Sequence, residues 1–75
     1  MTALDVVFRY GAAPGEAEIR AIAPLRDVYG IRRLRFDEKE HTIRVEYDAS
    51  RLNEKTVAGL LRGAGIDLME KVALV

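Results

Sequence analysis

The chain contains no cysteine and only one histidine among its 75 residues. Without cysteine it can form no disulfide, offer no thiolate to a metal ion and use no cysteine nucleophile. The single histidine, His41, is expected at a hairpin tip, and the single serine, Ser50, in a strand-to-helix turn. These two residues do not make a nucleophile–base pair. We therefore expect a protein that is not an enzyme and that carries no cofactor.

An excess of one charge is also missing. Twelve basic residues balance twelve acidic ones, and this argues against a surface dedicated to nucleic acid or to anionic membranes. No apolar run approaches the roughly 20 residues of a membrane span, and residues 1–5 lack the features of a signal peptide. The length suits one small domain, residues 1–75, which we expect in the cytoplasm.

The first half of the chain predicts a strand, a loop and an interrupted helix. Apolar and polar residues alternate over Leu4–Tyr10, which is typical of a half-buried strand. The glycines and proline of Gly11–Gly15 predict a loop, and a helix follows it. Pro24 lacks the N–H that a regular helix needs, so this helix should kink or tighten there, and Gly30 ends it.

The middle of the chain predicts a hairpin and a second helix. Two strands, Ile31–Phe36 and Thr42–Tyr47, flank the polar loop Asp37–His41. The helix that follows should begin after Asn53, whose side chain suits an N-cap. Gly65 suits the left-handed position just after the end of that helix.

A final strand over Leu68–Val75 completes the element order β-α-β-β-α-β. This order predicts an α+β fold of the ferredoxin-like type, a four-stranded antiparallel sheet with two helices on one face. Right-handed crossovers place the last strand beside the first, the first beside the third and the third beside the second. The predicted core consists of apolar residues that share the inward phase of these elements: Val6, Phe8, Ile22, Leu34, Phe36, Ile43, Val45, Leu60 and Leu61.

Several short patterns point to a known family. They are a Gly-Ile step, a hairpin that ends in Tyr-Asp, and a helix that ends in Ala-Gly-Ile. The residues that carry them are Gly30-Ile31, Leu34-Arg35-Phe36, Ile43-Arg44-Val45-Glu46-Tyr47-Asp48, Val57, Leu60-Leu61 and Ala64-Gly65-Ile66. In these positions the chain resembles the heavy-metal-associated (HMA) domain family of copper chaperones and metal-ATPase N-terminal modules. The resemblance implies the same βαββαβ scaffold.

The metal motif of that family, Gly-Met-x-Cys-x-x-Cys, is missing. The equivalent loop consists of Gly11, Ala12, Ala13, Pro14, Gly15, Glu16 and Ala17. Cu(I) and Zn(II) at such a site need thiolate ligands, which these residues do not supply, so we predict no metal site here. A plain connecting loop is the favoured interpretation. The alternative is an anion held by backbone N–H groups, which Glu16 and Glu18 oppose.

The outward phase of the strands places arginines on the open face of the sheet. They are Arg9, Arg33, Arg35 and Arg44, with Asp5 and Glu46 as partial counter-charges. The first interpretation is cross-strand salt bridging on a solvated face. The second is a face that binds an acidic protein partner or a second copy of the chain. The strand aromatics fall on the inward phase, so the stacking platform of RNA-binding sheets is missing.

Taken together, the patterns predict a small non-enzymatic binding module that acts in protein interaction or regulation. Its expected partner is another protein or a second copy, and neither nucleic acid nor a membrane. One alternative is a protein for metal-ion binding or transport with non-cysteine ligands, for example at the tip Asp37–His41. Another is a small-molecule sensor in which paired βαββαβ domains hold a ligand between them.

Overall fold

Helices and strands follow one another in the predicted βαββαβ order. The structure, a computed structural model, describes residues 3–74. Its elements are β1 (Ala3–Tyr10), α1 (Glu16–Ile22), the 3₁₀ helix η1 (Ala23–Asp27), β2 (Ile31–Asp37), β3 (Thr42–Asp48), α2 (Glu54–Gly63) and β4 (Leu68–Leu74). Val75, the last residue of the predicted final strand, lies outside the described residues.

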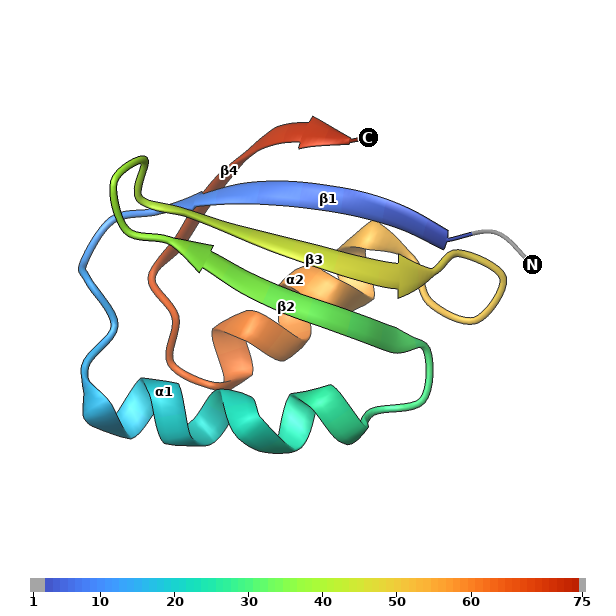
Figure 1. Ribbon diagram of the computed structural model, residues 1–75, viewed down its shortest axis with the longest axis horizontal. Helices are drawn as coiled ribbons and strands as arrows, with labels where there is room; N and C mark the ends of the chain where they lie inside the picture. The colour runs from blue at the N-terminus through green and yellow to red at the C-terminus, as the bar shows by residue number, and fades with distance from the viewer. Residues whose placement is uncertain (1–2, 75) are drawn as a thin grey trace.

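The four strands form one antiparallel sheet in the order β2-β3-β1-β4. Both helices lie on the same side of this sheet, which leaves its other face open (Figure 1). The predicted ferredoxin-like α+β architecture and the predicted strand order are therefore confirmed. β2 and β4 are the two edge strands of the sheet.

The first helix tightens at Pro24, as the sequence predicts. Regular α-helix stops at Ile22, and the chain tightens into η1, with the proline at its N-terminal positions. A proline is tolerated there because the first N–H groups of a helix have no partner within it. None of the helices in residues 3–74 has both the length and the apolar character that a membrane crossing requires.

The second helix begins and ends at the predicted residues. The side chain of Asn53 accepts a hydrogen bond of 2.8 Å from the backbone N–H of Thr56. At the other end Gly65 has φ of +94°, and the N–H of Ile66 donates to the carbonyl of Leu61 at 3.1 Å. This 6→1 bond is typical of a Schellman motif, in which a left-handed glycine closes the helix. The cap therefore holds Leu61 and Ile66 together in the core.

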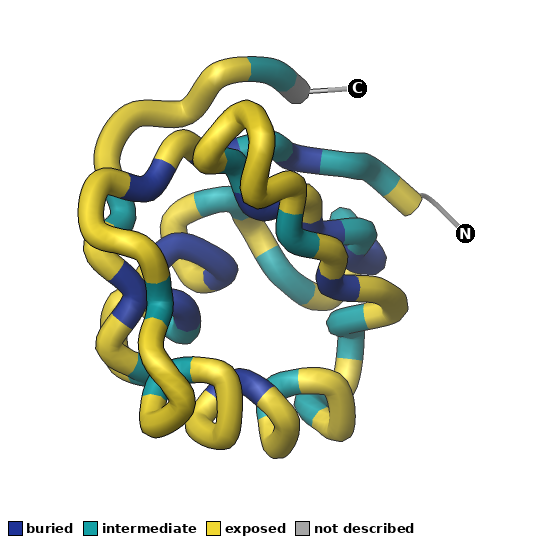
Figure 2. The backbone as a smooth tube through the Cα atoms, turned by 60° about the vertical axis from the view of Figure 1, so that its left-hand side comes forward, coloured by how far each residue is buried: buried dark blue, intermediate teal, exposed yellow. Residues whose placement is uncertain are grey.

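The core lies between the sheet and the helices, where buried segments of both layers face each other (Figure 2). Seven of the predicted core residues are buried: Val6, Phe8, Ile22, Leu34, Ile43, Val45 and Leu61. Phe36 and Leu60 are only partly buried, so their assignment to the core was wrong. Phe36 packs against the core from an edge strand, β2. On α2 the buried stripe runs through Val57, Ala58 and Leu61, and Leu60 lies beside that stripe.

Candidate functional site on the open sheet face

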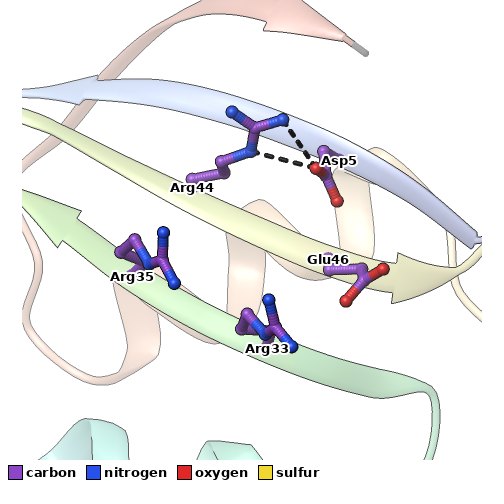
Figure 3. A pocket seen from close by; sticks show the side chains of 5 residues that line it. All are labelled: Asp5, Arg33, Arg35, Arg44 and Glu46. Atoms are coloured by element: carbon purple, nitrogen blue, oxygen red, sulfur yellow. Dashed lines mark hydrogen bonds and ion pairs between the residues drawn. The ribbon is translucent and has the colours of Figure 1, made fainter.

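Five charged residues line a cavity on the open face of the sheet. Its volume is about 230 Å³, and its lining residues are Asp5 from β1, Arg33 and Arg35 from β2, and Arg44 and Glu46 from β3 (Figure 3). They meet there because every second residue of a strand points to the same face, and the ladders align the three strands. Three guanidinium groups thus share the site with two carboxylates.

Arg44 is held in place by Asp5. Its Nε and Nη2 both donate to Oδ2 of the carboxylate, at 3.0 and 2.7 Å. The pair is partly exposed, with the side chain of Asp5 27% and that of Arg44 49% accessible. A charge-assisted bond of this kind orients the guanidinium more than it stabilises the fold. In Figure 3 the guanidinium of Arg44 reaches toward Asp5 and away from Arg35.

Arg33 and Arg35 have no such partner. Arg35 stands opposite Arg44 in the β2–β3 ladder, and Arg33 stands opposite Glu46. Nevertheless, the guanidinium groups of Arg33 and Arg35 form no hydrogen bond or ion pair with any residue in the described range 3–74. Like charges directly opposite each other in a sheet destabilise it. The site therefore contains two exposed guanidinium groups that form no ion pair within residues 3–74.

Arg9 does not belong to the cavity, although the sequence groups it with the other three arginines. Its Nε instead lies 2.8 Å from Oε1 of Glu70 on β4. Salt bridging, the first interpretation of this face, thus describes Arg9 and Arg44 but leaves out Arg33 and Arg35. The ion pair between Arg9 and Glu70 depends on the register of β4 against β1. That register is irregular, and strand alternation in the sequence does not reveal it.

Several backbone N–H groups of the loop between β1 and α1 donate hydrogen bonds to acceptors within the protein. The backbone N–H of Ala12 donates to Oδ2 of Asp67 at 2.9 Å, and that of Gly11 donates to the carbonyl of Asp67, also at 2.9 Å. The N–H of Gly15 donates to Oε1 of Glu18 at 2.8 Å. These carboxylates take the backbone donors that an external anion would need. The loop therefore uses the N–H groups of Gly11, Ala12 and Gly15 internally, and Asp67 is the residue that sequence reasoning missed.

The hairpin tip carries an aromatic contact around His41. The imidazole stacks on Tyr10, with ring centroids 5.5 Å apart, and the carbonyl of His41 accepts the Tyr10 N–H at 2.9 Å. Burial raises the pKa of Tyr10, and the nearby carboxylates of Glu38 and Asp37 raise it further. Across residues 3–74, no three His, Asp or Glu side chains lie in a group that could hold a metal ion.

Aromatic side chains do not reach the open face from the strands. Phe8, Tyr10 and Tyr47 are buried on the helix side, and Phe36 packs against the same core. The remaining aromatic residue, Tyr29, is 73% exposed in the connection before β2, with the guanidinium of Arg51 4.1 Å from its ring centroid. The open sheet face thus presents charged side chains and offers no ring on which a base could stack.

Ser50 supports a turn. Its hydroxyl donates to Oδ1 of Asp48 at 2.7 Å, and its backbone N–H donates to the same oxygen at 3.0 Å. These two bonds, together with the charge of Arg51, lower the pKa of the Asp48 carboxyl. Asp48 ends β3, so this network fixes the chain as it leaves the sheet toward α2.

Comparison with known proteins does not assign the chain to a family. No protein-family model matches the sequence, and no curated protein is detectably similar to it. The function must therefore be argued from the site itself.

Proposed function

We propose that the protein is a non-enzymatic binding module, HMA-like in scaffold, whose open sheet face binds an acidic segment of another protein. One observation carries this proposal: Arg33 and Arg35 line a cavity with Arg44 but have no carboxylate partner within residues 3–74. Guanidinium groups bind carboxylates through paired hydrogen bonds with a geometry that lysine cannot match. Carboxylates from a partner would neutralise the repulsion that these arginines create.

The dimensions and surroundings of the site favour a protein ligand. A cavity of about 230 Å³ accommodates a few side chains, which suits carboxylates presented by a peptide. The whole chain has no net charge, so an anionic ligand must be held by a local group of basic residues such as this one. A nucleic acid would gain little from so restricted a patch, since its affinity depends on many phosphate contacts. Acidic side chains on a protein need only two or three guanidinium partners.

The test is isothermal titration calorimetry, in which a glutamate-rich peptide is titrated into the full chain and the dissociation constant is measured. We expect the double variant Arg33→Glu/Arg35→Glu to weaken binding at least tenfold. The matched control, Arg26→Glu/Arg62→Glu, changes the net charge equally at exposed positions on η1 and α2. Only this comparison separates the open face from general electrostatic attraction.

Two results would contradict the proposal. Equal loss of affinity in both double variants would show that net charge, rather than the open face, controls binding. Stoichiometric binding of Cu(I) or Zn(II) below micromolar concentration in equilibrium dialysis would instead support metal handling with non-cysteine ligands.

A further inference from the structure

One edge of the sheet is unpaired within residues 3–74 and regular along most of its length. β2 lies at the end of the strand order and has β3 as its only neighbour in the sheet. From Arg33 to Asp37 it pairs with β3 residue by residue, without a register shift. The outer side of such a strand presents a row of backbone N–H and C=O groups that no other strand uses. β2 is therefore a template on which a further strand can form.

The opposite edge is different. The pairing of β1 with β4 shifts register twice, between Val7 and Phe8 and between Phe8 and Tyr10. Irregularities of this kind bend an edge strand and interrupt the spacing of its hydrogen-bonding groups. β2 has one register shift of its own, between Ile31 and Arg33, but its ladder is continuous from Arg33 to Asp37, the longer regular stretch of the two edges.

The charges of β2 determine which strand it can accept. Arg33 and Arg35 occupy alternate positions and both point to the open face. On this face of β2 a second copy of the chain offers one carboxylate, Asp37, and could place it beside only one of the two arginines. Other registers would bring arginine beside arginine, and like charges side by side destabilise a sheet. A strand with acidic residues at every second position would place carboxylates next to both guanidinium groups. Charge complementarity thus favours an acidic partner over self-association.

The helix-facing side of β2 determines which residues should alternate with the acidic ones in the added strand. Leu34 is buried toward the helix layer, and Phe36 packs against the core but remains partly exposed. η1 lies beside β2 on this side, with Leu25 partly buried against the core. Apolar side chains on an added strand would extend this contact. The edge therefore fits a segment in which acidic and apolar residues alternate.

We infer that β2 takes up an extended acidic segment of a partner protein as a fifth strand, with alternate acidic side chains beside Arg33 and Arg35. The inference rests on the function proposed above and adds the geometry of binding. Main-chain hydrogen bonds to β2 supply affinity in this mode, and the alternate side chains supply specificity.

The experiment uses an acetylated peptide of alternating glutamate and valine and the full chain. A control peptide has the same composition, with all glutamates in one block and all valines in the other. Two further peptides carry N-methyl groups on alternate backbone amides, one on the odd amides and one on the even amides. Only one of these sets faces β2 in an added strand, because successive amides point to opposite sides.

We expect the alternating peptide to bind at least tenfold more tightly than the block peptide. One N-methylated peptide should lose at least tenfold in affinity, and the other should bind nearly as the parent does. Slower hydrogen exchange at alternate amides of β2 should accompany binding. Equal affinity of all four peptides, still dependent on Arg33 and Arg35, would refute strand addition and leave the acidic-binding function standing. Absence of binding by every peptide would refute both.

Discussion

Arg35 and Arg44 stand directly opposite each other across the β2–β3 ladder, and only Arg44 is paired with a carboxylate. Asp5 draws the Arg44 guanidinium toward β1, so that Arg35 keeps an exposed position on β2. An arrangement selected for stability alone would place an acidic residue at one of these two positions. Under the function proposed above, the opposed pair is where the requirements of binding and of stability conflict.

Reversing the charge of Arg35 should stabilise the fold and weaken the binding of acidic peptides. The variant Arg35→Glu replaces a like-charge pair with an opposite-charge pair, which should raise the free energy of unfolding by about 0.2–1 kcal/mol. Urea denaturation at low and high salt measures this gain, which salt should reduce. Loss of stability in the variant would mean that the Arg35 side chain has an intramolecular role.

Removing the carboxylate of Asp5 should strengthen the binding of acidic peptides. Asp5→Asn frees the Arg44 guanidinium and removes a competing negative charge from the cavity. We expect affinity to rise severalfold, with a change in stability below about 1 kcal/mol because the pair is partly exposed. Glu70→Gln is the matched control, since it frees Arg9 outside the cavity with the same change in charge. An equal gain in both variants would show that only net charge matters.

Two adjacent leucines of α2 should differ in their contribution to stability. Leu61 is 1% exposed, and truncation to alanine should cost about 2–5 kcal/mol, enough to unfold much of so small a domain. Leu60 is partly buried beside the buried stripe, so Leu60→Ala should cost clearly less. Thermal denaturation of the two variants side by side provides the measurement. Equal loss of stability would place both leucines in the core.

The Asp48 network should make stability depend on pH in the acid range. The pKa of Asp48 is lowered in the folded protein from its ordinary value of 3.8, mainly by the hydrogen bond from the Ser50 hydroxyl. Ionised Asp48 therefore stabilises the fold above that value, and the contribution is lost as the pH falls through the folded-state pKa. Ser50→Ala should move this pKa upward and reduce the acid dependence. Carboxyl NMR titration of both proteins measures the shift, and an unchanged pKa would contradict the role of Ser50.

The parts of the fold that depend on local sequence could be predicted. Alternation in the strands, Asn53 as a cap and Gly65 as a left-handed end each reflect preferences within a few residues. The same holds for Pro24. Its missing N–H ends the regular α-helix at Ile22, and this effect does not depend on what the helix packs against.

Contacts between distant segments could not be predicted in the same way. Asp67 lies 55 positions from Ala12, whose N–H it accepts, and no local pattern connects them. The charges of the candidate site were partly predicted, because strand alternation places Arg33, Arg35 and Arg44 on one face. Their different pairing was not, since it depends on which carboxylate each guanidinium can reach once the strands are aligned.

The unequal edges of the sheet also affect how copies of the chain could assemble. A chain with two regular edges can receive a strand at one side and donate at the other, and such units polymerise into fibres. Here the double register shift along β4 interrupts the second edge. Copies of the chain that take up a strand at β2, as inferred above, are therefore not expected to join edge to edge into fibres.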